Sequence, residues 1–363
     1  MQGSKELEKL HLKRRARWPF IILAFLLINF FVMTVSLSIG SAHIPSTKVL
    51  GVFAGKIQAV LGFQVQALNV DEVSEAIIFQ VRLPRVLLAS LVGGSLAVAG
   101  AIFQGIFKNP MADPYVIGVS SGAALGASLV IVLGVDYTFL GVSTIPIVAF
   151  ITATMSLLII YNISRIGSRV PVMTLLLSGI AIGIFFSAIV SFLHIIAGEK
   201  LHALVFWLMG GFSYAEWKDV QIMLPFICIG FIIVYLFARD LNILQLSEEE
   251  AAGLGVEVEK VKRNLIICGS LLTAAAVSIS GLIGFVGLII PHIVRMLIGP
   301  DHRILLPSVL IVGAFFLVTC DTIARVVFPP AELPVGIITA FSGVPFFIYL
   351  LRKAKGKYMF HAV

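Results

Sequence analysis

Continuous runs of about 20 uncharged, mostly apolar residues recur along the chain, and they limit its fold more than any other feature. A run of this length crosses the hydrocarbon core of a bilayer once as a helix. Because the runs do not alternate between apolar and polar residues, they predict helices rather than a transmembrane barrel. Hydrophobic residues make up 59% of the 363 residues and charged residues only 12%. This composition excludes a soluble enzyme, a disordered protein and a secreted disulfide scaffold.

We expect an all-α, polytopic membrane protein with ten transmembrane helices in a compact bundle. A basic cytoplasmic tail at 1–17 precedes a membrane domain at 18–351, which contains a cytoplasmic loop at 240–263, and a second basic tail follows at 352–363. The apolar stretch at 201–215 is too short to cross and is predicted to be interfacial or re-entrant. The predicted spans are 18–38, 86–107, 115–135, 139–163, 172–197, 220–238, 264–280, 281–298, 304–320 and 333–351.

The distribution of Lys and Arg gives the predicted orientation. With ten spans and a cytoplasmic N-terminus, 19 of these residues lie on the inner side and 7 on the outer side, as the positive-inside rule requires. If the uncharged run 265–294 crossed only once, the tally would become 14 and 12. The tally therefore favours two spans in this run and places both termini in the cytoplasm. It also accounts for the formal charge of +7 without a nucleic-acid partner.

The predicted spans contain few ionisable residues that could conduct ions, transfer protons or catalyse a reaction. Ionisable residues within spans mark ion and proton pathways, but here Asp321 lies at the edge of the ninth span, and only His194 and His292 lie near span interiors. We expect a route lined by apolar and small polar side chains, with no buried charge in any span. We also predict no catalytic residues.

No cofactor or metal is expected on this chain. Cys228, Cys268 and Cys320 stand singly in apolar runs, so none forms a metal-binding or redox pair. The segment 51–56 resembles a phosphate-binding loop but is one residue too short, and Ile57 stands where Ser or Thr would hold magnesium. If the protein pumps, ATP and its magnesium are bound by another chain.

The loop between the sixth and seventh spans is predicted to be a docking site for a cytosolic partner. Ser247 is a suitable N-cap, and the acidic first turn after it suits the dipole of a short helix. Gly253 and Gly255 are expected to end this helix and to let a second short surface helix begin. A plain solvated loop is the alternative. The residues assigned to this site are Ser247, Glu248, Glu249, Glu250, Ala251, Gly253, Leu254 and Gly255.

Two further groups of residues lie at the predicted membrane surfaces. On the inner side, the sharp turns 108–114 and 164–171 are either plain connectors or parts of a gate. On the outer side, Arg82, Arg85 and Arg325 stand where few cations are expected. Arginine at an exposed rim suits bidentate binding of a partner's carboxylates. An internal pair such as Arg325 with Glu332 is the alternative.

Several motifs together resemble the permease subunits of bacterial ABC importers for iron-siderophores, haem and cobalamin, over about residues 36–352. They begin with the string Arg-Leu-Pro-Arg-Val at 82–86. The others are Gly-Ala-Ile-Phe-Gln-Gly at 100–105, Asn-Pro-Met-Ala-Asp-Pro at 109–114, Gly-Val-Ser-Ser-Gly at 118–122, Phe-Trp-Leu-Met-Gly at 206–210, Gly-Phe-Val-Gly-Leu-Ile-Ile-Pro-His at 284–292, Gly-Pro-Asp-His-Arg at 299–303 and Ala-Glu-Leu-Pro-Val-Gly at 331–336.

The resemblance implies the assembly and the roles of these sites. A second permease subunit, identical or different, would complete the membrane unit, two cytosolic ATPase subunits would drive it, and an extracytoplasmic binding protein would deliver the ligand. In similar permeases the loop matching 246–255 couples to the ATPase, and the three arginines receive acidic residues of the binding protein. Residues matching Asn109, Pro110 and Met111, with the turn near Ser168, narrow the inner exit.

The predicted route runs along the fifth and tenth spans, which similar permeases use about the dimer axis. Packing against neighbouring helices is the alternative for both stripes. We expect a bacterial cell-membrane permease that imports a metal chelate, with a ferric siderophore first and haem or cobalamin next. A self-contained channel or secondary transporter is the competing class. The residues assigned to the route are Ser178, Gly179, Gly183, Ser187, Gly336, Thr339 and Gly343.

Overall fold

The structure is a computed structural model that describes residues 16–40, 44–60, 71–135, 137–139, 141–167 and 169–359. Side chains at 57–60, 139, 142, 351 and 353–359 are outside this description. The described chain is helical apart from one antiparallel pair of two-residue strands, β1 (Thr138–Phe139) and β2 (Val142–Ser143). The all-helical class predicted from the sequence is thus confirmed.

The helices follow the predicted spans closely. Two of the smaller elements are 3-10 helices, η2 (Pro114–Ile117) and η3 (Gly198–Lys200), and a π-helix, η1 (Ile77–Arg82), leads directly into α5. The α-helices are α2 (Trp18–Ser38), α3 (Ser46–Val60), α4 (Glu72–Ala76), α5 (Leu83–Ile106), α6 (Val119–Leu133), α7 (Thr144–Ser164), α8 (Val172–Ile196), α9 (Leu201–Met209), α10 (Trp217–Leu236), α11 (Ala238–Ile243), α12 (Glu248–Gly253), α13 (Val258–Ser280), α14 (Val286–Ile298), α15 (His302–Val326) and α16 (Val335–Met359).

Seven helices are long and apolar enough to cross a membrane: α2, the continuous stretch from α4 through η1 to α5, α7, α8, α10, α13 and α15. Three shorter apolar helices, Val119–Leu133, Val286–Ile298 and Val335–Leu350, fall in the third, eighth and tenth predicted spans. The uncharged run 265–294 is divided as expected, because α13 ends at Ser280 and α14 begins at Val286. A break at this point needs left-handed backbone, which Gly281 (φ 69°) and Phe285 (φ 69°) supply.

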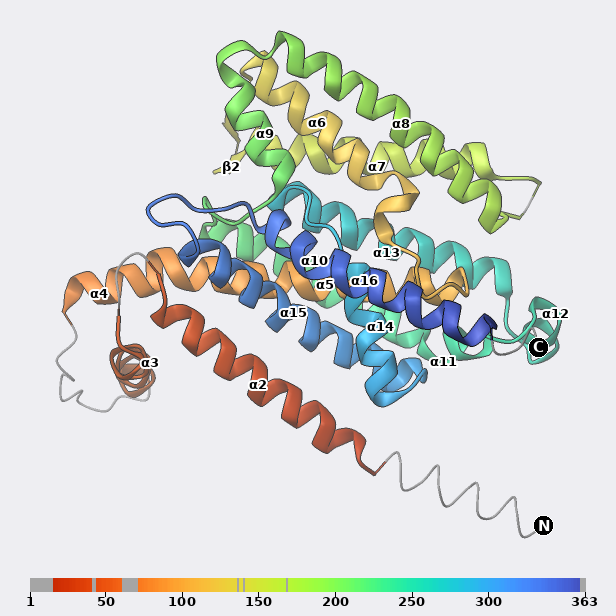
Figure 1. Ribbon diagram of the computed structural model, residues 1–363, viewed down its shortest axis with the longest axis horizontal. Helices are drawn as coiled ribbons and strands as arrows, with labels where there is room; N and C mark the ends of the chain where they lie inside the picture. Colours follow the sequence, from red (N-terminus) through yellow and green to blue (C-terminus); the bar gives the residue numbers. More distant parts are fainter. Residues whose placement is uncertain are drawn as a thin grey trace.

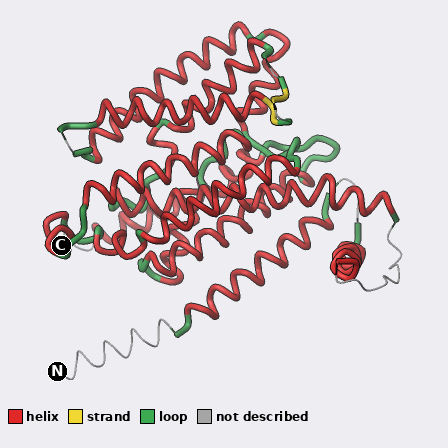
Figure 2. The backbone as a smooth tube through the Cα atoms, turned by 180° about the vertical axis from the view of Figure 1, so that it is seen from behind, coloured by secondary structure: helices red, strands yellow, loops and turns green. Residues whose placement is uncertain are grey.

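Helix α5 occupies the centre of the larger part of the bundle, where it packs against α10, α13, α14 and α15. Helices α6, α7, α8 and α9 form a second group beside it (Figures 1 and 2). Helix α13 contacts α5 on one side and both α6 and α7 on the other, so it joins the two groups.

The centre of the bundle is held by close backbone contacts between glycines. A Cβ atom added at Gly100 on α5 would overlap the carbonyl oxygen of Gly287 on α14, and one added at Gly93 would overlap that of Gly313 on α15. In lipid, helices gain little from the hydrophobic effect when they associate, so close approach at small residues supplies much of the packing energy. The glycines are therefore sites of contact between helix backbones.

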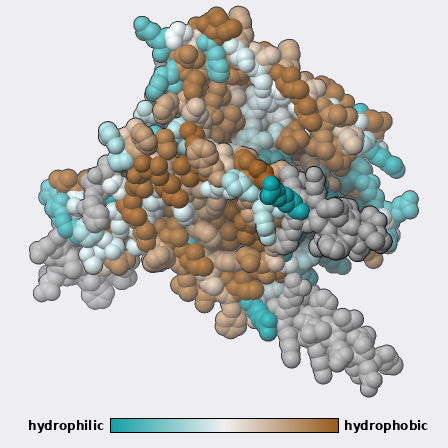
Figure 3. Space-filling model, in the orientation of Figure 1, coloured by the Kyte–Doolittle hydropathy of each residue, from teal (hydrophilic) through white to brown (hydrophobic). Residues whose placement is uncertain are grey.

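The surface carries a broad apolar band. Figure 3 shows apolar residues over most of the visible face, with hydrophilic residues gathered toward the two ends of the long axis. Helix α2 exposes Phe20, Phe30 and Phe31, and α8 exposes Leu177 and Ile184. Large exposed apolar faces of this kind are stable only against lipid or another subunit.

The glycine contact predicts a stability effect at Gly100. In the Gly100→Ala variant the added methyl group must push α5 and α14 apart, so we expect a loss of about 1–3 kcal/mol in unfolding free energy. Gly284→Ala is the matched control, because a Cβ there meets no atom within 4 Å. Thermal unfolding in detergent, followed by circular dichroism, compares the two. Equal melting temperatures would show that the contact is not tight.

Candidate functional site

Helix α12 begins with the cap that the sequence predicts. The Ser247 hydroxyl accepts a hydrogen bond from the Glu250 backbone N–H (3.2 Å), and the Glu250 carboxylate accepts one from the Ser247 backbone N–H (2.9 Å). This reciprocal pair satisfies two N–H groups that a helix start leaves without partners. The hydrogen bonds from Ser247, backbone N–H first, hold the pKa of the Glu250 carboxyl below its ordinary value.

The prediction of a second short surface helix is wrong. Helix α12 ends at Gly253, and Gly255 adopts the left-handed conformation (φ 85°) that turns the chain. The next helix, α13, begins at Val258 and continues without a break to Ser280. The charged residues between 259 and 263 interrupt the apolar pattern but contain no helix breaker, so the membrane helix extends into the loop.

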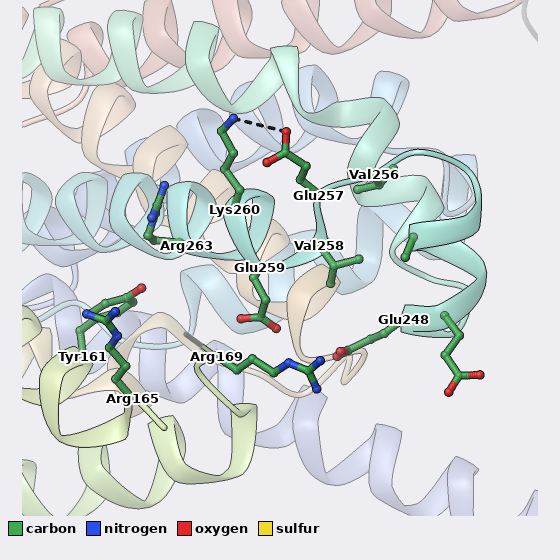
Figure 4. A pocket seen from close by; sticks show the side chains of 12 residues that line it. Tyr161, Arg165, Arg169, Glu248, Val256, Glu257, Val258, Glu259, Lys260 and Arg263 are labelled. Carbon is green, nitrogen blue, oxygen red and sulfur yellow. Dashed lines mark hydrogen bonds and ion pairs between the residues drawn. The ribbon is translucent and has the colours of Figure 1, made fainter. Parts of the chain in front are cut away.

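A cavity of about 930 Å³ lies between the α12–α13 turn and the turn after α7 (Figure 4). It combines four acidic and four basic residues. Glu259 accepts a hydrogen bond from the Val170 backbone N–H (3.2 Å), which ties the two turns together. The lining residues are Tyr161, Arg165, Arg169, Glu248, Glu249, Ala252, Val256, Glu257, Val258, Glu259, Lys260 and Arg263.

The three acidic residues in the first turn of α12 differ in their partners. Glu248 pairs with Lys262, whose side chain is nearly buried and also lies 3.7 Å from Glu259. Glu250 is held in the cap. The carboxylate of Glu249 makes no ion pair or hydrogen bond among the described residues. It is thus available for a contact outside this chain.

The turn after α5 is folded on itself. The Asn109 side-chain oxygen accepts a hydrogen bond from the Met111 backbone N–H (2.9 Å), and the Asn109 carbonyl accepts one from the Ala112 N–H (3.1 Å). Asn109 and Pro110 are exposed and Met111 is partly buried. Their role as a gate stays a prediction, and Ser168, assigned to the same gate, lies outside the described residues.

A second cavity, of about 650 Å³, runs between α6 and α8 and contains three of the residues assigned to the fifth-span route. Gly179, Gly183 and Ser187 face it from α8, whereas Ser178 does not line it. Its wall is mostly apolar. The other lining residues are Tyr115, Val116, Gly118, Ser120, Ser121, Ala124, Ile180, Ile184, Val190, Ser191, Leu208 and Leu282.

The tenth-span residues lie elsewhere. Thr339 is fully buried, and its hydroxyl donates to the Gly336 carbonyl (3.0 Å). Gly336 packs against the backbone of α9, and a Cβ at Gly343 would lie 2.5 Å from the Phe285 ring. Within this chain these residues pack against neighbouring helices, as the alternative has it, and their assignment to the route stays a prediction.

The three outer arginines are buried rather than exposed at a rim, which corrects the sequence-based expectation. Arg82, Arg85 and Arg325 are 5%, 7% and 8% exposed. Arg85 donates from Nε and Nη2 to Asp321 (3.0 and 2.8 Å) and from Nη1 to Glu332 (2.8 Å). The internal partner of Glu332 is therefore Arg85 rather than Arg325.

The same cluster anchors the end of α2. Arg325 donates to the Ser36 hydroxyl (2.7 Å) and the Ile39 carbonyl (3.0 Å), and Arg82 donates to the Leu37 carbonyl (2.7 Å). Asp321, at 0% exposure, lies between Arg85 and Arg325. The expectation that no span holds a buried charge is therefore wrong. The i, i+4 spacing of Asp321 and Arg325 was the signal in the sequence.

Comparison with known proteins shows the family. Residues 26–353 match the model of the FecCD transport family. The cobalamin import permease BtuC of Halobacterium salinarum is 46% identical over 78% of this chain and 75% of its own length. The hemin permease HmuU of Yersinia pestis is 40% identical over 93% and 97%. A metal-chelate type ABC transporter, solved facing inward, aligns with a TM-score of 0.79 at 35% identity and covers 92% of this chain and 99% of its own.

The chain belongs to the FecCD transport family, and its apolar helices make it a multi-pass membrane protein. It is a permease subunit of the ABC import class, as the motifs predicted, and a transport component rather than a catalyst. Among the described residues no three His, Cys, Asp or Glu side chains gather to hold a metal ion.

The buried cluster of Arg82, Arg85, Asp321 and Arg325 predicts that neutralising Asp321 lowers the stability of the protein strongly. The Asp321→Asn variant leaves Arg85 and Arg325 with too little negative charge in a buried site, and removing one partner of such a group costs about 3–5 kcal/mol. We expect lower thermal stability and poor yield in detergent. Asp71→Asn is the control, because the Asp71–Lys48 pair is exposed and the asparagine keeps the helix cap. Similar losses in both variants would contradict this account.

Proposed function

We propose that this chain forms the membrane pathway for a metal chelate, with a ferric siderophore as the first candidate and haem or cobalamin next. The observation that carries the proposal is the mostly apolar α6–α8 cavity of about 650 Å³, in a chain whose relatives import such compounds. An apolar wall with small polar groups suits passage of an amphipathic chelate without tight binding. We place the tight site on a separate extracytoplasmic binding protein.

The proposed topology has ten spans and both termini in the cytoplasm of a bacterial cell. Its support is geometric. The start of α2 and the end of α16 point toward the end of the molecule that carries α12 (Figures 1 and 2). Ends on the same side require an even number of crossings, and seven long plus three short apolar helices supply ten.

A second permease subunit, identical or different, would cover the exposed apolar face of α8. This helix lines the cavity with Gly183 and Ser187, and it exposes Leu177, Ile184 and Phe185 beside them. A route between two such faces would be closed on its open side by the partner, and lipid would cover the remaining apolar surface.

Energy would come from two cytosolic ATPase subunits that bind ATP with magnesium, and this chain would bind no cofactor. The α12 helix and the charged cavity beside it offer the docking surface. Glu248 and Glu250 are held by contacts within the chain, so Glu249 is the acidic residue best placed to meet a basic group on the ATPase.

The binding protein would dock near the outer arginine cluster. Arg82, Arg85 and Arg325 are buried, so we place the approach of an acidic residue of the partner beside Glu332, which pairs with Arg85 and whose side chain is 38% exposed. A partner carboxylate would then take over the contact that Glu332 makes with Arg85.

Transport by the reconstituted system tests the cargo and the energy source. The permease, its ATPase and its binding protein in proteoliposomes should take up a ferric hydroxamate siderophore when ATP is present, and an inactive ATPase variant should abolish uptake. Ionophores that dissipate ion gradients should have no effect. Haem and cyanocobalamin are assayed in parallel. Uptake that follows an ion gradient without ATP would instead indicate a secondary transporter.

The coupling role of α12 is tested by reversing one charge. In the Glu249→Lys variant the α12 cap is intact, so the protein should fold, while we expect the uptake rate to fall about tenfold because a charged contact in the interface is reversed. Uptake and copurification of the ATPase are the measurements. Glu199→Lys, an exposed reversal outside α12, should behave like the unmodified protein. Normal uptake with Glu249→Lys would remove α12 from the coupling surface.

A further inference from the structure

The segment that leads into α12 is bridged to the turn after α5 by two side chains that reach in opposite directions. Gln245 donates from Nε2 to the Gly105 carbonyl (3.1 Å), and Lys108 donates from Nζ to the Leu246 carbonyl. Gly105 lies in the last turn of α5, and its carbonyl also accepts a hydrogen bond from the Lys108 backbone N–H (3.4 Å). We call these two hydrogen bonds the inner tie.

Packing beneath the inner tie is close. Leu241 on α11 is fully buried, and a Cβ at Gly105 would lie 3.1 Å from the Leu241 side chain and 3.1 Å from the His302 ring. A Cβ at this distance would have to displace one of these side chains slightly, so α11 rests directly on the end of α5. Movement of α11 toward the bundle is therefore resisted by atoms already in contact.

The backbone at Lys108 is unusual. Its φ of 50° lies in the left-handed region, which glycine and asparagine adopt readily and other residues seldom do. Glycine or asparagine at this position would therefore satisfy the geometry of the turn more readily than lysine does. What lysine adds is a long side chain with an ammonium group, and this group contacts Leu246.

The inner tie links two small folded units. Leu246 directly precedes Ser247, which caps α12. On the other side, the Asn109 backbone N–H donates to the Gln104 carbonyl (3.2 Å), and the Asn109 side chain holds the Met111 N–H. Because each unit is braced by its own hydrogen bonds, a displacement of one is passed to the other through the inner tie.

We propose that Lys108 and Gln245 are positioning residues that transmit movement of α12 to the turn at 109–111. The proposal rests on the proposed function, in which α12 meets the ATPase, and on the predicted role of this turn as a gate at the inner exit. It adds a mechanical connection: the loop that receives the ATPase and the turn at the exit would move together because two side chains bridge them.

The Lys108→Asn variant tests this connection. Asparagine keeps the left-handed turn but is too short to reach Leu246. We expect the amount of chelate taken up per ATP hydrolysed to fall about fivefold or more, while ATPase copurification and hydrolysis stay normal. Lys108→Arg, which keeps a long cationic donor, should restore much of the ratio. Lys218→Asn, a change in an exposed lysine at the start of α10, is the control for loss of a lysine.

A second measurement reports on the turn itself. With the three native cysteines replaced, the Met111→Cys variant is treated with a water-soluble thiol reagent with and without ATP. Reactivity should differ between the two states, and the difference should be lost when Lys108→Asn and Gln245→Met are added. A residue that merely stabilises the fold would lower yield but would leave this difference in place.

The outcomes separate the two proposals. Suppose that the unmodified transporter couples ATP hydrolysis to uptake. If the Lys108→Asn variant then takes up as much chelate per ATP hydrolysed and shows the same change in Met111→Cys reactivity, the inner tie does not transmit movement. The proposed function is unaffected by that result. If the unmodified transporter shows no ATP-dependent uptake, the proposed function fails. A low ratio with normal hydrolysis, restored by Lys108→Arg, supports the transmission role.

Discussion

Direct contact between helix backbones is the constraint on which the rest of this structure depends. Inside a bilayer an apolar side chain packs about equally well against lipid and against protein. A bundle of apolar helices therefore needs another source of packing energy. Here α5 supplies it at Gly93 and Gly100, which lie against Gly313 and Gly287. Once α5 is fixed against α14 and α15, Arg82 and Arg85 near its start and the turn at 109–111 after its end are placed at opposite ends of the bundle.

Much of the fold could be predicted because its signals are local. The all-helical class, the Ser247 cap and the break after Ser280 each depend on a few neighbouring residues, and the structure agrees with all three. The number of ten spans stays a prediction, because seven of the described helices are long enough to cross a membrane. The family also followed from the sequence, since its motifs are long and occur in a fixed order. On α8, three of the four residues assigned to the route, Gly179, Gly183 and Ser187, face one cavity because they recur at the helical period, and their role in the route stays a prediction.

Long-range pairing could not be predicted. Arg85 and Asp321 are 236 positions apart, and no local pattern shows that their side chains meet. An arginine near a span end is therefore easily interpreted as exposed, when a distant carboxylate in fact allows it to be buried. The role of the small residues on α16 could not be decided from the sequence for the same reason. A small residue on a helix face suits an open route and a tight contact equally, and the contacts with α9 and Phe285 leave no local pattern.

The outer arginine cluster also has a consequence for biosynthesis. Helix α2 is made well before α15, yet the carbonyl groups at its end, at Ser36, Leu37 and Ile39, receive hydrogen bonds from Arg82 and Arg325. The second of these donors emerges from the ribosome nearly 300 residues later. Arg82 can reach α2 much earlier, but the hydrogen bonds from Arg325 and the packing against α15 form only after α15 has been made. Insertion and assembly of this chain are thus separate stages, and the second is completed only near the end of translation.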